Sequence, residues 1–394
     1  TAAVDVTISG SSRSPQYEGG IELRDAAVHV MKPTLSIERV TGSLRLTGEG
    51  MELHRTTLSL NGEPLTLQAT IAPLAGPRIA ATVGLPHGRL SLTGRVTPTD
   101  VLIDQARLVL AHSDVLMRGI IGLGVAQPSA LDLSGTVEFT ELAELPFVKL
   151  PALTAWHLQG LGTVEATFRG RLSDWPAATI EGRLRADRLS VRDIPIEQLA
   201  STLEQSDGVL HLRVPSGLCA GGMCWGELTV ERRPPTTPGK YFLQADVVGL
   251  QLATLAQAIP TWRSRSVTGS VSAHALVSGT WEQRSTWRGE GWLNVSGERL
   301  GDVPLLDKLF RGLFGVLGDR LGLESLRRAQ ITQASVPWRL SQERVHTENL
   351  RFGGMAGTEP VAVYATGSLG LDRTLDLVIE PELSEGVVLQ APTT

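Results

Sequence analysis

The sequence predicts a mainly β protein, in which one long antiparallel sheet has an apolar face and a polar face. Three observations lead to this prediction. Apolar and polar residues alternate along most of the 394-residue chain, turn-forming residues separate the alternating runs, and one long segment is repeated without a gap. Alternation is typical of strands, because successive side chains point to opposite faces of a sheet. A sheet with one apolar face is typically antiparallel.

The clearest alternating run is LDLSGTVEF, residues 131–139, whose leucine, valine and phenylalanine side chains are expected on one face. Residues 163–170, TVEATFRG, and residues 270–279, SVSAHALVSG, show the same alternation. Clusters of Gly, Pro, Asn and Asp lie between such runs, as in NGEP at residues 61–64, and predict tight turns. We therefore expect the chain to run as a meander of strands.

One segment of the chain is repeated at a spacing of 109 residues. Gly160 aligns with Gly269, and Pro195 aligns with Pro304, with no gap between these two points. A weaker repeat lies upstream, where GSLRLTG, which begins at Gly42, resembles GRLSLTG, which begins at Gly88. Repeats of this kind predict an array that adds strands to one continuous sheet.

Helical patterns are short except in one place. The segments TELAELP, residues 140–146, and LQLATLAQAIP, residues 250–260, each end at a proline, which lacks the backbone donor that would continue a helix. The long pattern is residues 302–329, DVPLLDKLFRGLFGVLGDRLGLESLRRA. It predicts an amphipathic helix whose apolar stripe comprises Leu306, Leu309, Phe310, Leu313, Phe314 and Leu317.

Two interpretations of that helix stay open. It either covers the apolar face at one end of the sheet, or it touches a membrane surface and gates a path for lipids. We expect the chain to comprise three segments. They are N-terminal strand repeats in 1–130, the stronger repeats in 131–301, and the amphipathic helix with the closing strands in 302–394.

Composition and charge exclude some classes of function. The net charge is −5 and no run is rich in Lys and Arg, which argues against nucleic acid as a partner. No apolar run approaches the ~20 residues that span a bilayer as a helix. Because the sequence begins with Thr1, we expect a form from which an anchor or export signal has been removed.

The two cysteines, Cys219 and Cys224, lie in the segment CAGGMC. Thiols this close form a disulfide in an oxidising compartment, or they are two small buried residues beside a Gly-rich turn. The sequence leaves both interpretations open. A zinc site would need further ligands, and none lies nearby at a suitable spacing, so no metal is expected.

Catalytic motifs are absent from the sequence. It holds no G-x-S-x-G, H-E-x-x-H, P-loop or G-x-G-x-x-G pattern, so we expect neither an enzyme nor a cofactor. His274 falls on the polar side of its strand pattern and is expected to be solvated. Trp175, Trp281 and Trp287 lie near turns, which leaves a glycan-binding surface as an alternative.

The C-terminal two thirds of the chain resemble a known family. Four segments carry the resemblance in order: LATLAQAIPTW with VTGSVSAHALVSG, then GEGWLNVSGERLGDVPLLDKL, then ITQASVPWRLSQERVHTENLRF, and finally YATGSLGLDRTLDLVIEPEL. From about Leu131 to Leu383 the chain is similar to the AsmA-like C-terminal region of the AsmA/TamB group of cell-envelope proteins in Gram-negative bacteria. The resemblance is looser upstream.

The resemblance implies an elongated antiparallel sheet that curves into an apolar groove, in the manner of a β-taco or solenoid, with short connecting helices. It also implies a periplasmic protein that an N-terminal helix, absent from this chain, tethers to the inner membrane. Proteins of this group move phospholipid toward the outer membrane or take part in outer-membrane assembly. The implied partners are phospholipids or other acyl lipids, with envelope proteins as possible partners at the C-terminal end.

An open apolar sheet would suit lipid tails, because their removal from water is favoured by about 25 cal/mol per Å² of apolar area. The residues expected to line such a groove are Leu131, Leu133, Val137, Val164, Phe168, Val271, Ala275, Val277, Leu375 and Leu377. Alternation alone also suits a closed sandwich in which these side chains pack together. Besides lipid binding, a scaffold for envelope assembly and a carbohydrate-active β protein remain as alternatives.

Overall fold

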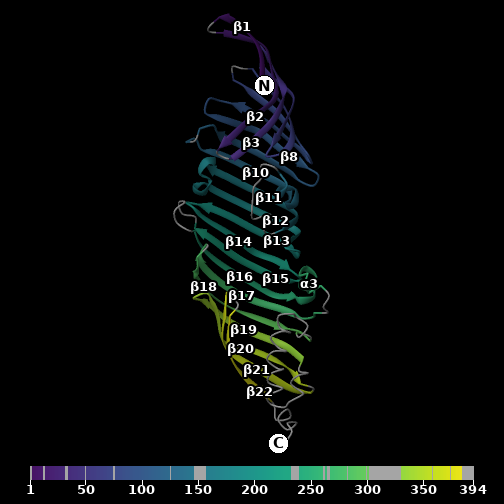
Figure 1. The fold of residues 1–394 in the computed structure, drawn as a ribbon, viewed down its shortest axis with the longest axis vertical. Helices are drawn as coiled ribbons and strands as arrows, with labels where there is room; N and C mark the ends of the chain where they lie inside the picture. Colours follow the sequence, from purple (N-terminus) through teal and green to yellow (C-terminus); the bar gives the residue numbers. More distant parts are fainter. Residues whose placement is uncertain are drawn as a thin grey trace, which may run out of the picture. The chain divides into compact units, whose positions relative to one another are not determined.

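The computed structural model of the chain describes residues 2–11, 14–31, 34–48, 50–73, 76–124, 126–145, 157–231, 239–260, 262–263, 267–281, 283–298, 300, 330–356, 358–372 and 374–383. The chain is mainly β, with 78% of it in strands of one 22-stranded antiparallel sheet that is not closed on itself. Within the described ranges three short helices interrupt the strands (Figure 1). The predicted fold class is therefore confirmed.

Contacts divide the chain into two units, Thr1–Leu189 with Glu204–Asp207, and Ser190–Leu203 with Gly208–Thr394. The first half of the strands comprises β1 (Ala2–Ser11), β2 (Ser14–Met31), β3 (Thr34–Thr47), β4 (Gly50–Leu60), β5 (Glu63–Ala72), β6 (Arg78–Leu85), β7 (Gly88–Val96), β8 (Asp100–Leu110), β9 (Asp114–Gly122), β10 (Ser129–Glu138), β11 (Leu158–Gly170) and β12 (Thr179–Val191). The second half comprises β13 (Ile194–Ser206), β14 (Val209–Cys219), β15 (Gly222–Glu231), β16 (Lys240–Gln251), β17 (Ser270–Thr280), β18 (Gln283–Ser296), β19 (Gln330–Ser341), β20 (Arg344–Ala356), β21 (Glu359–Gly370) and β22 (Leu375–Leu383).

The strands form the predicted meander. From β1 to β11 in the first unit, and from β14 to β22 in the second, each strand pairs antiparallel with its neighbour in the sequence. Asn61 and Gly62 join β4 to β5 with φ values of 51° and 95°. Positive φ at both central residues matches the right-handed twist of the flanking strands, so the predicted turn at NGEP is confirmed.

In the first unit, register places apolar side chains directly opposite one another across eleven strands. Residues opposite each other in an antiparallel pair point to the same face. The row runs through Val4, Ile21, Leu44, Leu53, Ala69, Ala81, Leu92, Ala106, Met117, Leu133 and Ala166. Because no polar residue interrupts this row, one face of β1–β11 is apolar from strand to strand.

In the second unit, a comparable row is covered by other residues. It runs through Leu250, Val271, Val295, Ala334, Phe352 and Val363. Leu252, Ala256, Val267 and Leu300 pack against it and complete a cluster in which Phe352 is 1% exposed. This part of the second unit is therefore an ordinary buried core.

Two of the short helices, α1 and α3, form where the sequence predicts helical pieces. Helix α1 (Phe139–Ala143) begins after Glu138, whose carboxylate accepts a hydrogen bond from the Glu141 backbone N–H at 2.9 Å. Helix α3 (Leu252–Ala258) ends two residues before Pro260. The 3₁₀ helix η1 (Leu172–Ala177) was not predicted from the sequence.

The predicted amphipathic helix at 302–329, with its stripe from Leu306 to Leu317, lies outside the described residues. The three segments predicted from the sequence stay a prediction. Among the residues described, no helix has the length and apolar character needed to cross a membrane.

Candidate functional site

The five predicted groove residues of the first unit lie together on its apolar face. Leu131 on β10 lies opposite Phe168 on β11, and Val164 lies opposite Gly135, between Leu133 and Val137. Val137 is buried in a small cluster with Val115 and Phe139, while Leu133 and Val164 are half-buried at its margin. These five side chains therefore share one face of the sheet, and their role as the lining of a lipid groove stays a prediction.

The five predicted residues of the second unit also share a face. A row links Val277 on β17 through Gly289, Leu340, Val345 and Leu369 to Leu375 on β22. Val271, Ala275 and Leu377 project to the same side, because each is an even number of residues from a member of this row on its own strand. Leu375 is 57% exposed, so an apolar side chain on this face contacts solvent.

The short helices cover only parts of the apolar faces. Phe139 and Leu142 of α1 pack beside Val137 and Val164, and Leu145 packs with Leu85 on the first unit. Leu252 and Ala256 of α3 pack in the core of the second unit. Most members of the long apolar row in β2–β11 are instead half-buried.

The structure adds members that were not predicted. Leu44, Leu53, Ala69, Leu92 and Met117 belong to the apolar row of the first unit. Alternation in LTLQATIA and GRLSLTG was the available signal, since both segments repeat the pattern used for β10 and β11.

Trp338 is a further unpredicted member, on the apolar face of the second unit. Its indole lies close to β18, where a Cβ placed on Gly291 would lie 2.7 Å from a ring carbon of Trp338. The glycine therefore makes room for the indole, and the indole covers the backbone that the glycine leaves bare.

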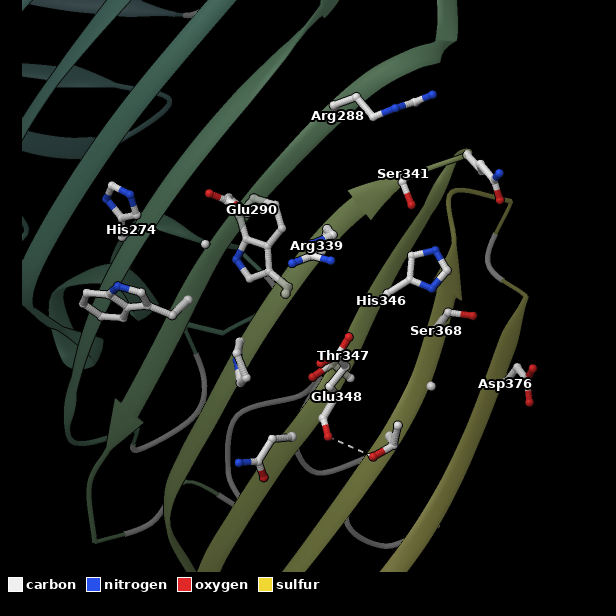
Figure 2. Close-up of a pocket in the computed structure, with 18 residues that line it drawn as sticks. His274, Arg288, Glu290, Arg339, Ser341, His346, Thr347, Glu348, Ser368 and Asp376 are labelled. Carbon is white, nitrogen blue, oxygen red and sulfur yellow. Dashed lines mark hydrogen bonds between the residues drawn. The ribbon is translucent and has the colours of Figure 1, made fainter.

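The polar face of the second unit carries a hollow of about 1110 Å³ (Figure 2). A cross-strand row of polar residues forms much of its floor, and it runs through Glu290, Arg339, His346, Ser368 and Asp376 on five successive strands. Figure 2 shows these side chains one after another across neighbouring strands, with His274 beyond Glu290. No sequence motif indicated this hollow, because its residues come together only through strand register.

His274 is held more firmly than was expected. It lies on the polar face, as predicted, but its side chain is only 24% exposed and its Nδ1 lies 2.6 Å from Asp246 Oδ1. The indole of Trp292, directly opposite on β18, stacks against the imidazole with a centroid distance of 6.5 Å. The imidazole is therefore only partly solvated, with a carboxylate and an indole beside the ring.

The two thiols are free and lie on adjacent strands of one hairpin. Cys219 lies opposite Gly222 and Cys224 lies opposite Gly217, so both project to the apolar face. Hydrogen bonding from the Cys219 thiol lowers the pKa of Cys224 to about 7. The same interaction, with burial, raises the pKa of Cys219.

Two of the three tryptophans considered for glycan binding come together. Trp281 and Trp287 both contact Tyr241, with ring centroids 4.8 Å and 6.3 Å from that of Tyr241. The Trp287 indole N–H donates to the Thr280 carbonyl at 3.2 Å, so this N–H already has a hydrogen-bond partner within the protein. Trp175 lies in η1.

The described part of the chain holds no cluster of three or more His, Cys, Asp or Glu side chains that could bind a metal ion. No protein-family model matches the chain, and a search of the curated proteins finds no match. Its similarity to the AsmA/TamB group therefore stays a prediction from the sequence.

Proposed function

We propose that this chain binds phospholipid, or another acyl lipid, by its tails along the apolar face of the sheet. The observation that carries the proposal is the unbroken apolar row from Val4 to Ala166, most of whose members are only half-buried. A closed protein core would bury such side chains, whereas a surface that receives a mobile apolar ligand must leave them accessible.

The length of the row suits acyl chains. Eleven strands at about 4.8 Å spacing give a track on the order of 50 Å within the first unit. One leaflet of a bilayer core is about 15 Å thick, so the track exceeds the length of a single extended tail. The tails would lie against the leucine and alanine side chains, while the headgroups remain in water and need no polar site on this face.

The resemblance to envelope proteins is the basis for proposing where in the cell the protein acts. We place the protein in the periplasm, tethered to the inner membrane by a helix outside this chain, where it conducts lipid between the inner and outer membranes without catalysis. A scaffold for outer-membrane assembly, with no lipid bound, is the competing function that the experiment below must distinguish.

Native mass spectrometry with lipid extraction tests the proposal on the purified chain. Wild type should carry phospholipid, and Val164→Asp or Val277→Asp should lose it, because a charge among acyl tails costs about 2.5–3.5 kcal/mol, or roughly a hundredfold in affinity. Thr163→Asp and Ser278→Asp are matched controls, since each neighbours a target valine but projects to the polar face.

Three outcomes would contradict lipid binding. A folded wild-type chain without lipid, or valine variants that retain lipid, would favour the scaffold. Equal loss in the threonine and serine controls would show that added negative charge, rather than the apolar face, determines the result.

A further inference from the structure

The polar hollow of the second unit has the size of a site for an oligomeric ligand. Its volume of about 1110 Å³ exceeds the range for pockets that enclose one drug-sized molecule, roughly 300–1,000 Å³. The hollow is formed by side chains of β17–β22 and lies on the opposite face of these strands from Val271, Ala275 and Val277. A ligand bound here would therefore not compete with lipid tails for the same surface.

Hydrogen-bonding groups in the hollow alternate in kind from strand to strand. Glu290 is an acceptor, Arg339 directly opposite is a donor, and His346 follows on the next strand. Neighbouring strands lie about 4.8 Å apart, so the groups form a ladder with that repeat. In the described structure these three side chains form no ion pair or hydrogen bond with one another, and they remain available to a ligand.

An aromatic platform lies at one end of the ladder. The Trp292 indole is 37% exposed, and His274, fixed by Asp246, supports it from the neighbouring strand. Trp225, which lies opposite Asp246 on β15, is 38% exposed on the same face. Exposed indoles with a supporting partner offer flat apolar surfaces beside polar groups.

Charge in the hollow argues against an anionic ligand. Arg288 and Arg339 are opposed by Glu290, Glu348 and Asp376, so the lining has no excess of positive charge to hold phosphate or sulfate. A peptide strand would instead add to a sheet edge through its backbone, whereas this hollow lies over one face of the sheet, near the turns that join β19 to β20 and β21 to β22. Hydroxyl groups both donate and accept, so a polyol chain can bond to carboxylate and guanidinium in turn.

We propose that the hollow binds a neutral oligosaccharide, which stacks on Trp292 and hydrogen-bonds to Glu290, Arg339 and His346. The chain would lie across the strands, with successive sugar rings over successive rungs of the ladder. This site is separate from the Trp281 and Trp287 cluster. The proposal is also independent of lipid binding.

The test is a titration of the full chain with cellohexaose, maltohexaose and chitohexaose. Tryptophan fluorescence and calorimetry measure the binding. At least one hexasaccharide should bind, and Trp292→Ala should weaken that binding about tenfold or more. Arg339→Met, which keeps much of the side-chain length, should weaken it by a similar factor, because a hydrogen bond to a charged group is lost. Trp281→Ala removes an exposed indole elsewhere and should leave the affinity unchanged.

Each remaining outcome would overturn the proposal. Absence of binding to all three hexasaccharides at millimolar concentration would exclude the neutral class tested. Equal loss in Trp281→Ala would move the site to the Tyr241 cluster, and tighter binding of heparin than of any neutral chain would reverse the charge argument. Circular dichroism of each variant must match wild type, and Val164→Asp should lose lipid without losing oligosaccharide, which separates this proposal from the lipid proposal.

Discussion

Gly160 and Gly269 occupy equivalent places in the two long repeats and share a left-handed backbone conformation. Their φ values are +115° and +125°. A Cβ on Gly160 would lie 2.8 Å from the Arg188 carbonyl oxygen, and one on Gly269 would lie 2.2 Å from the Ser296 carbonyl oxygen. The repeat is therefore structural as well as sequential, since both copies bring a strand against its neighbour at a point where no side chain fits.

Replacing either glycine should destabilise the protein. Gly160→Ala and Gly269→Ala should each lower the free energy of unfolding by about 1–3 kcal/mol, because alanine meets both an unfavourable φ and a carbonyl oxygen. Urea unfolding followed by circular dichroism measures the change. Gly48→Ala is the control, because a Cβ there meets no atom within 4 Å. A loss in Gly48→Ala as large as that in the two repeat glycines would contradict the close-approach argument.

Phenylalanines at covered and open positions should differ in their contribution to stability. Phe352→Ala should cost about 3–5 kcal/mol, because that ring is 1% exposed in the core of the second unit. Phe168→Ala, on the open apolar face of β11, should cost only about 1 kcal/mol in the lipid-free chain. Denaturant titration compares the two. Equal costs would mean that Phe168 is packed inside a closed sandwich, which would also weaken the case for lipid binding.

Glu141 should make stability depend on pH on the acid side. Burial acts to raise the pKa of Glu141, but hydrogen bonds from Ser113 Oγ at 2.7 Å and from His112 outweigh it and hold the pKa below its ordinary value. The folded chain therefore binds a proton less readily than the unfolded chain. This stabilisation is complete above the ordinary carboxyl pKa and is lost as the pH falls through the folded value.

Urea midpoints of wild type and Glu141→Gln, measured from neutral pH down to pH 3, test this prediction. The two curves should differ most at neutral pH and converge in acid. Ser113→Ala should reduce the same acid-side slope, because it removes one of the donors. Parallel curves for wild type and Glu141→Gln would contradict the assignment.

Cys224 should react with thiol reagents at neutral pH. With a pKa of about 7, about half of its thiol groups are thiolate at pH 7, whereas an ordinary cysteine with a pKa near 8.5 is only a few per cent ionised. The rate of iodoacetamide labelling should therefore rise with a midpoint near pH 7. Cys219→Ala should move that midpoint upward, since the Cys219 thiol is the cause of the lowered pKa. A wild-type midpoint above pH 8 would contradict the lowered pKa of Cys224.

The sequence was sufficient to predict which face of a strand is apolar, because that property depends only on alternation. The sequence was insufficient to predict the hollow, because Trp292 and His274 become neighbours only through strand register. Bulges shift that register at points that alternation does not mark, such as Val247–Leu250.

Turns also differ in whether their residues predict their conformation. Asn61–Gly62 follows residue preference, whereas Gln342–Glu343 adopts φ values of 50° and 60° that the residues themselves disfavour. Strand pairing on both sides imposes that conformation.

The apolar row in the first unit has a consequence for how such a protein changes in evolution. Each strand contributes one side chain to the row, so duplication of a hairpin would lengthen the track by about 10 Å and leave every existing contact in place. Insertion of a single residue within a strand would instead turn the following side chains to the opposite face. Natural variation in such chains should therefore favour whole hairpins, and the span of the track is a quantity that gene duplication can adjust in steps.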